Sequence, residues 1–254
     1  MKLKIDFNCD MGESFGMYKM GADEQIIPYI TSANIACGFH AGDPNWMNQT
    51  VKLAEKNNVG IGAHPSFPDL KGFGRRNMNV SNEEVKNDLK YQMGALTAFT
   101  KDKKLQHVKP HGAMYNQSVE DENLSRAICE AILEFDENII LIALANSKWI
   151  KIAKEMGLKV AREIFADRAL NPDGSLVSRS ITGSVIHDTR TVINRSIKMI
   201  KNGSATTIEG KEISVEADSI CLHSDTPGSI EMAKLLHSEL GQNGIEIQKI
   251  TSLI

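Results

Sequence analysis

The first apolar run of the chain reads IDFNCDMGESFG over residues 5–16, and its polar members raise the question of what they do. Ile5 to Cys9 has the period-two pattern of a β-strand. The polar positions are Asp6, Asn8 and Asp10, and an acidic residue, Glu13, follows a glycine turn. A solvated strand end would explain polar residues, but not this clustering of carboxylates and an amide. The explanation depends on whether other strand ends carry similar chemistry.

Further short apolar runs alternate with longer segments of helical periodicity. The predicted strands are 3–9, 33–37, 59–63, 106–110, 139–144, 159–164, 218–222 and 245–250. Such alternation favours a parallel sheet, because parallel strands need crossover connections. We expect one domain over residues 1–254, an α/β TIM-like (β/α) barrel of seven or eight mainly parallel strands. An open doubly wound sheet is less suitable, because it would concentrate the polar residues at one switch point instead of after nearly every early strand.

Residues 166–217 interrupt this alternation with a long polar loop and an expected hairpin. The segment ADRALNPDGSLVSRSITGSVIHD is rich in Gly, Ser and Arg, and a long structured loop in a compact domain is usually a lid or binding element. A helix is predicted at about 189–202. TTIEGKEISV then resembles a small hairpin turning at Gly210–Lys211.

Helix-start signals fix several other boundaries. Asp43 and Thr226 are predicted caps followed by Pro44 and Pro227, since a proline in the first helical position needs no N–H donor. Ser81 and Glu84 form a predicted capping box, and the helix from about 227 is expected to end near Gly241.

Composition and charge exclude several classes of protein. The 254 residues carry a net charge of −3, so there is no basic footprint for nucleic acid. The polar amino terminus lacks the apolar core of a signal peptide, and the strongest apolar run, IILIALA at 139–145, is too short to cross a bilayer. Four widely spaced cysteines without a CxxC pair favour reduced thiols. We therefore expect a cytoplasmic protein with neither nucleic acid nor membrane as a partner.

Polar and charged side chains follow one predicted strand after another, and in a parallel barrel they would meet at its carboxyl-terminal face. This explains the opening stretch, because Asp10 and Glu13 would form one wall of a shared site. The candidate catalytic residues are Asp10, Glu13, His40, His64, Lys109 and His111. The candidates for binding substrate or phosphate are Asn8, Asn34, Arg75, Arg76, Arg168, His223 and Asp225.

Several chemistries fit these residues. Asp10, His40, His64 and His111 could hold Zn²⁺ or another divalent ion, although these four residues are not spaced as a compact HxxxH or HExxH motif. The same groups could act as general acid and base.

Three other features bear on the chemistry. GFGRR offers two guanidinium groups suited to phosphate or carboxylate, or it is a solvated surface turn. Neither a P-loop nor a strand-turn-helix GxGxxG occurs in the sequence. Cys9, Cys37 and Cys221 lie beside strand ends, but small buried cysteines in strands are commoner than nucleophilic ones.

Six of these segments together resemble the LamB/YcsF family of bacterial 5-oxoprolinase A subunits. The motifs occur in the family's order from residue 5 to 228: DFNCDMGESFG, ANIACGFHAGDP, GAHPSFPDLKGFGRR, VKPHGAMYN, EIFADR and CLHSDTPG. The resemblance implies a modified TIM-like barrel, similar to the glycoside hydrolase/deacetylase barrels. Departures from the family's usual residues are Phe67, Met114, Leu170 and Ser224, and Ser224 lies beside the expected site.

The resemblance also implies an activity. The expected reaction is ATP-dependent hydrolytic ring opening of 5-oxo-L-proline (pyroglutamate) to L-glutamate, with ADP and phosphate, together with separate B and C subunits. ATP would be a co-substrate, and a divalent metal is an open question. Two alternatives remain: an autonomous metal-dependent deacetylase-like hydrolase, and a non-catalytic subunit that binds the lactam or nucleotide for a partner enzyme.

Overall fold

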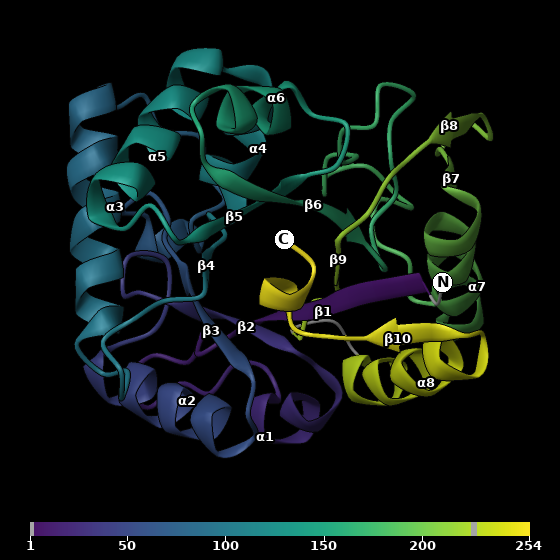
Figure 1. The fold of residues 1–254 in the computed structure, drawn as a ribbon, viewed down its shortest axis with the longest axis horizontal. Helices are drawn as coiled ribbons and strands as arrows, with labels where there is room; N and C mark the ends of the chain where they lie inside the picture. Colours follow the sequence, from purple (N-terminus) through teal and green to yellow (C-terminus); the bar gives the residue numbers. More distant parts are fainter. Residues whose placement is uncertain (1–2, 225–227) are drawn as a thin grey trace.

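A closed barrel of parallel strands forms the centre of the computed structural model, which describes residues 3–224 and 228–254 (Figure 1). Its strands are β1 (Leu3–Met11), β2 (Ser32–Ala36), β3 (Gly60–His64), β4 (His107–Val108), β5 (Ile140–Leu144), β6 (Lys159–Phe165) and β9 (Ser219–Cys221). Each strand pairs in parallel with the next, and β9 pairs with both β6 and β1, which closes the ring. The predicted barrel is therefore confirmed, with seven strands in the ring.

Three predicted strands are shorter than expected by two residues or more, and one of them is β9, which covers Ser219–Cys221 of the predicted 218–222. Over 106–110, β4 is reduced to two residues, although the Gln106 and Lys109 amides still donate to β3 carbonyls on either side. Over 245–250, β10 (Ile245–Ile247) lies outside the ring against the start of β1. The prediction of a strand through Ile250 was wrong, because the chain there enters the 3₁₀ helix η3 (Ile250–Ser252).

Helices surround the barrel, as Figure 1 shows. They are α1 (Asp23–Ile26), α2 (Pro44–Lys56), α3 (Asn82–Thr97), α4 (Gly112–Glu120), α5 (Glu122–Phe135), α6 (Lys148–Glu155), α7 (Thr189–Asn202) and α8 (Ser229–Gln242), with short 3₁₀ turns η1 (Ile27–Tyr29) and η2 (Leu70–Gly72). Asp43 accepts hydrogen bonds from the Asn45 and Trp46 amides, and the Ser81–Glu84 capping box is present. The predicted cap at Thr226–Pro227 lies outside the described residues. Among the described residues, no helix has the length and apolar character that spanning a membrane requires.

The alternation in β1 has a structural explanation. Phe7, Cys9 and Met11 belong to the apolar core that the barrel shares with the helices. The intervening Asp6 and Asn8 are fully buried and bond to other strands of the ring. Asp6, for example, accepts from Ser32 Oγ at 2.6 Å and Ser219 Oγ at 2.5 Å. The inner side of β1 is thus polar and its outer side apolar, so the strand is buried on both faces.

Part of the barrel interior is apolar. Ile140 and Ile142 of β5 and Ala161 of β6 form a small separate cluster with Ile250 of η3. Figure 1 shows this C-terminal turn over the centre of the ring. The C-terminal turn therefore closes the interior of the barrel.

The long segment after β6 contributes to the rim where the strands end. Two isolated antiparallel bridges, Arg168 with Val185 and Leu170 with Leu176, fold it back on itself. After α7, β7 (Ser204–Thr206) and β8 (Glu212–Ser214) form an antiparallel hairpin. Gly210, with φ of 80°, lies in its turn.

Candidate functional site

A cavity of about 520 Å³ opens at the carboxyl-terminal end of the strands, between them and the segment after β6. Eight of the predicted site residues line it: Asp10, Glu13, His64, Arg75, Lys109, His111, Arg168 and His223. His40 lies directly behind His111, with the two rings stacked at 3.7 Å. Asn8 and Asn34 are fully buried below the cavity, Arg76 is outside its lining, and Asp225 lies outside the described residues.

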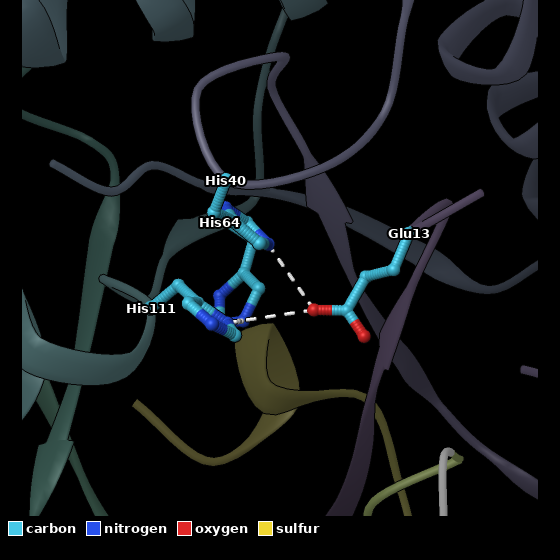
Figure 2. A group of neighbouring side chains, drawn as sticks. All are labelled: Glu13, His40, His64 and His111. Carbon is cyan, nitrogen blue, oxygen red and sulfur yellow. Dashed lines mark hydrogen bonds and ion pairs between the residues drawn. The ribbon is translucent and has the colours of Figure 1, made fainter. Parts of the chain in front are cut away.

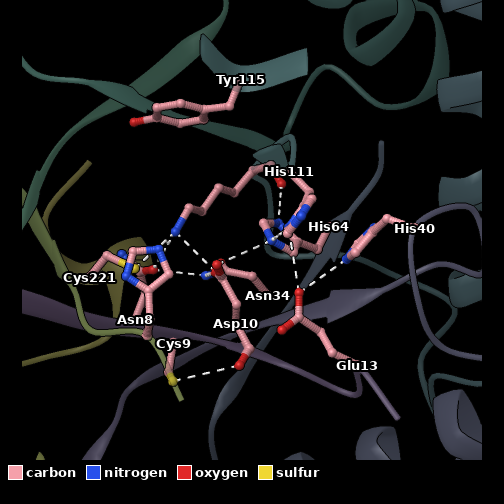
Figure 3. Close-up of polar contacts among 12 residues, drawn as sticks. Asn8, Cys9, Asp10, Glu13, Asn34, His40, His64, His111, Tyr115 and Cys221 are labelled. Atoms are coloured by element: carbon pink, nitrogen blue, oxygen red, sulfur yellow. Dashed lines mark hydrogen bonds and ion pairs between the residues drawn. The ribbon is translucent and has the colours of Figure 1, made fainter. Parts of the chain in front are cut away.

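Lys109 is the centre of a buried charge cluster at the cavity floor that includes Asp10 and Cys221, both labelled in Figure 3. Its Nζ lies 3.0 Å from Asp10 Oδ1, 2.9 Å from Glu163 Oε1 and 3.0 Å from Cys221 Sγ. Burial by itself lowers the pKa of Lys109, but Asp10 above all, with Cys221 and Glu163, raises it well above its usual range. The ammonium group is therefore kept charged between two carboxylates.

Asp10 is held as a carboxylate by the same arrangement. Burial alone would raise its pKa, but His64 and Lys109 lower the pKa of Asp10 well below its usual range. Asn34 Nδ2 also donates to Asp10 Oδ1 at 2.8 Å, and Asn34 is in turn held through its Oδ1, 2.8 Å from His107 Nε2. Asn8 and Asn34 thus support the site from inside the barrel.

Cys221 is a poor candidate for a nucleophile. Burial raises the pKa of the Cys221 thiol well above its ordinary value, and this effect outweighs the opposite influence of Lys109. A thiol that stays protonated lacks the thiolate form that attacks carbonyl groups. The same burial effect raises the pKa values of Cys9 and, to about 12, of Cys37.

Beside Asp10, the side chains of Glu13, His40, His64 and His111 converge, and we call them the histidine cluster (Figure 2). Glu13 Oε1 lies 3.1 Å from His40 Nε2 and 3.4 Å from His111 Nδ1. Burial lowers the pKa values of His40 and His111 well below the usual range, and neighbouring imidazoles lower them further. Both rings are therefore neutral at pH 7.

Two glycines allow the GFGRR loop to reach this cluster. Gly74 and Gly112 have φ of 63° and 55°, a region that glycine adopts without strain. A Cβ on Gly112 would lie 2.5 Å from the carbonyl oxygen of Gly74, which accepts from the Ala113 amide at 2.8 Å. This close approach brings the Phe73 carbonyl within 2.9 Å of His111 Nε2.

The arginines of the predicted phosphate-binding set have different surroundings. Arg75 lines the cavity with its guanidinium over the Phe73 ring, whereas Arg76 pairs with Asp69 and its side chain is 67% exposed. Arg168 is buried and donates to the carbonyls of Ser184 and Val177. Burial, helped by Arg179, lowers the pKa of Arg168 to about 10, so it remains a cation at neutral pH.

His223 is held by Asp167, a carboxylate that is not among the predicted site residues. Its Nδ1 lies 3.0 Å from both oxygens of Asp167, and its ring stacks on Phe165. If Nδ1 donates to Asp167, Nε2 becomes the ring nitrogen available in the cavity. Histidines oriented in this way act as general acids and bases.

The site has contributors that were not assigned to it from the sequence: Tyr115, Glu163, Asp167 and Arg179. Cys221, which bonds to Lys109, was considered only as a nucleophile. Glu163 and Phe165 occupy alternate positions at the end of β6, the same signal that identified Asp10 in β1. Tyr115 bonds to Glu163 at 2.7 Å from helix α4, where no strand-end rule applies.

The departures from the family's usual residues do not disturb the site. Ser224 Oγ donates to the main-chain oxygen of Asp10 at 3.0 Å, which ties the loop after β9 to the end of β1. Phe67, Met114 and Leu170 are buried apolar residues.

The fold and the cavity define a TIM-like barrel protein with a polar, charged site at the carboxyl-terminal rim. A peptidoglycan deacetylase of Bacillus subtilis shares this fold, with a TM-score of 0.52 at 11% identity, covering 99% of this chain and 90% of that one. The lactam utilization protein of Thermus thermophilus is much more similar. Its crystal structure superposes with a TM-score of 0.91 at 42% identity, covering 97% of this chain and 99% of that one.

Sequence comparison defines the family. The model of the LamB/YcsF family matches residues 5–254, so the chain belongs to this family, as the motifs indicated. The 5-oxoprolinase A subunit of Campylobacter jejuni is 54% identical over 253 residues, 99% of either chain. The 5-oxoprolinase A subunit of Thermococcus sibiricus is also 54% identical, over 99% of this chain and all of its own.

Proposed function

We propose that this chain is the A subunit of a cytoplasmic 5-oxoprolinase. Together with B and C subunits it would open the ring of 5-oxo-L-proline to L-glutamate, with conversion of ATP to ADP and phosphate. The names of its relatives support this reaction. On this chain, the main support for the proposed reaction is that buried carboxylates, an ammonium group and arginines meet in one cavity.

The chemistry of the lactam explains why ATP would be needed. A five-membered lactam is a resonance-stabilised amide and a poor electrophile. Transfer of the γ-phosphoryl group to its carbonyl oxygen gives an imidate-like ester, and water can add to that carbon. Cleavage of the C–N bond, with a proton delivered to nitrogen, leaves an acyl phosphate. A second water then releases phosphate and glutamate.

The cavity offers groups for these steps. Arg75, Arg168 and Arg179 line it, and such fork-shaped cations suit phosphate oxygens. At the floor, Asp10 is a carboxylate that can accept a proton from attacking water. His223, held by Asp167, can deliver a proton to the departing nitrogen. Lys109 is already compensated by Asp10 and Glu163, so we assign it to holding these carboxylates instead of binding phosphate.

The test is reconstitution with single components left out. The chain, the B and C subunits, ATP and 5-oxo-L-proline are mixed, and glutamate and ADP are measured. We expect both products only in the full mixture, and loss of turnover with Asp10→Ala or His111→Ala while the circular dichroism spectrum stays native. Undiminished glutamate formation in both variants would instead favour the non-catalytic subunit.

A metal-dependent deacetylase-like hydrolase is the second candidate, because three imidazoles and a carboxylate converge beside Asp10. The isolated chain, loaded with Zn²⁺ or Mn²⁺, is assayed on acetylated amino sugars without ATP. Hydrolysis of these substrates, abolished by a chelator, would favour this candidate over the ATP-dependent lactamase.

The two neighbouring arginines test where phosphate binds. We expect Arg75→Ala to raise the KM for ATP at least tenfold in the reconstituted enzyme, because Arg75 faces the cavity. Arg76→Ala should change it less than threefold, because Arg76 is turned toward Asp69. Equal effects of the two substitutions would refute the assignment.

A further inference from the structure

We propose that Glu13, His40, His64 and His111 form a binding site for one divalent transition-metal ion, with Zn²⁺ the best match to the ligands. The residues lie at or just after the ends of four successive strands, β1 to β4, and their ligand atoms lie within 4.8 Å of one another. All four are buried. Imidazole nitrogens with a carboxylate oxygen are ligands that Zn²⁺ takes in proteins.

Hydrogen bonds to the main chain fix two of the rings. His64 Nδ1 lies 2.6 Å from the Lys109 carbonyl oxygen, and His111 Nε2 lies 2.9 Å from the Phe73 carbonyl oxygen. A carbonyl only accepts, so each of these nitrogens carries the proton. Metal-binding histidines are commonly oriented by such a bond from the other ring nitrogen.

The remaining nitrogens then face one another. His64 Nε2 and His111 Nδ1 are 2.9 Å apart. Glu13 Oε1 lies 3.4 Å from His111 Nδ1. Two imidazole nitrogens and a carboxylate oxygen at these distances can bind one metal ion together.

His40 places a third imidazole beside Glu13. It is 1% exposed, and its Nε2 is 3.1 Å from Glu13 Oε1. A neutral imidazole that binds an ion through Nε2 carries its proton on Nδ1, and His40 Nδ1 has no hydrogen-bond partner among the described residues.

The geometry favours Glu13 over Asp10 as the carboxylate ligand, although the sequence indicated Asp10. Glu13 contacts both His40 and His111. Asp10 contacts only His64 of the three, at 3.3 Å, and is shared with Lys109 and Asn34. We assign Asp10 to the neighbouring reaction site, next to the ion.

The experiment measures metal binding with no lactam and no ATP, so its outcome is independent of the proposed reaction. The chain is stripped with a chelator and titrated with Zn²⁺ alone by calorimetry. We expect one ion per chain. Glu13→Gln and His111→Ala should weaken binding at least about 100-fold, since even outer partners of metal ligands are worth about 10–100-fold. His187→Ala, which removes an exposed histidine elsewhere, should bind as the unaltered chain does.

Thermal unfolding controls for misfolding. Zn²⁺ should raise the unfolding temperature of the unaltered chain and of His187→Ala, but not that of Glu13→Gln, whose side chain keeps its size. Failure of the unaltered chain to bind Zn²⁺ would overturn the proposal, as would unchanged binding by Glu13→Gln. Loss of binding in Asp10→Asn together with retention in Glu13→Gln would refute the choice of ligand.

Discussion

At Lys109, one ammonium group contacts two buried carboxyl groups, and what this contact contributes to stability can be measured. Lys109→Met leaves Asp10 and Glu163 buried without their cation. Removal of one partner of a buried ion pair costs about 3–5 kcal/mol, so we expect a loss of this size in the free energy of unfolding. Turnover of the reconstituted enzyme should fall at least about 100-fold, a loss of about 3 kcal/mol in transition-state stabilisation.

A second substitution separates charge from packing. In Lys109→Met combined with Glu163→Gln, one of the two unpaired charges is gone. We expect the urea midpoint to recover by at least half of the loss, since residues in one ion-pair network are not additive. Strictly additive effects would show that Lys109 contributes by packing alone.

Asp6 predicts a pH dependence of stability. Burial raises the pKa of Asp6 from its usual 3.8 to about 6, despite hydroxyl donors from Ser219, Ser32 and Thr31. The folded protein therefore keeps this proton at pH values where the unfolded chain has released it. The contribution of Asp6 to the free energy of unfolding is fully present below pH 3.8 and is lost as the pH rises through about 6. The total change is about 3 kcal/mol.

The measurement compares Asp6→Asn with the unaltered chain in urea at several pH values. Asparagine cannot ionise, so the substitution should cost about 2 kcal/mol less stability near neutral pH than at about pH 4. A cost that stays constant with pH would mean that folding does not shift the pKa of Asp6.

At the scale of single elements, local sequence signals predicted a helix and two helix caps well. They did not predict how deep in the barrel each residue of a strand lies. The helix expected at 189–202 is α7, and the caps at Asp43 and Ser81 are present. Asn8 was expected to contact substrate because it shares the alternation of Asp10. Asn8 and Asp10 lie on the same face of β1, so the sequence pattern does not distinguish them. Only Asp10 lines the cavity, whereas Asn8 is buried below it.

The GFGRR loop and the start of α4 form one unit, and Gly112 permits their contact. Gly112→Ala places a Cβ 2.5 Å from the Gly74 carbonyl oxygen in a left-handed conformation. Gly157→Ala is the matched control, with φ of 83° and nothing within 4 Å of the new Cβ. The left-handed conformation alone costs about 1–2 kcal/mol, and we expect this for the control.

Gly112→Ala should cost at least roughly 2 kcal/mol more than the control, because substitution into a filled space forces the backbone to shift. His111, the residue before it, should move with the backbone, so turnover should fall in this variant only. Denaturant unfolding and reconstituted activity check both points. Equal costs for the two variants would show that the contact between loop and helix is not tight.

For the whole molecule, the sequence predicted a barrel but left the number of strands in the ring at seven or eight. The last strand reads like the others, since Ile245 and Ile247 alternate with polar residues. Whether a strand closes the ring depends on pairing between residues more than two hundred positions apart, such as Asp6 with Ser219. That register is set by packing around the whole barrel, so no local pattern reveals it. The convergence of Asp10, His64 and His111 was nevertheless predictable, because parallel strands in one barrel end at the same rim.

The two ends of this barrel should serve different purposes, and Ile250 tests that division. Its side chain is fully buried against Ile140, Ile142 and Ala161 and closes the barrel interior with the C-terminal turn. Ile250→Ala should cost about 2–4 kcal/mol of stability, as truncations of buried isoleucines do. Ile254→Ala, four residues further on and 42% exposed, should change the free energy of unfolding by no more than about 0.5 kcal/mol.

Since functional groups of such barrels gather at the carboxyl-terminal rim, both variants should retain Zn²⁺ affinity and turnover per folded molecule. Denaturant unfolding, zinc titration and glutamate formation measure these quantities, and weakened zinc binding in Ile250→Ala alone would show that the closing turn and the site are coupled.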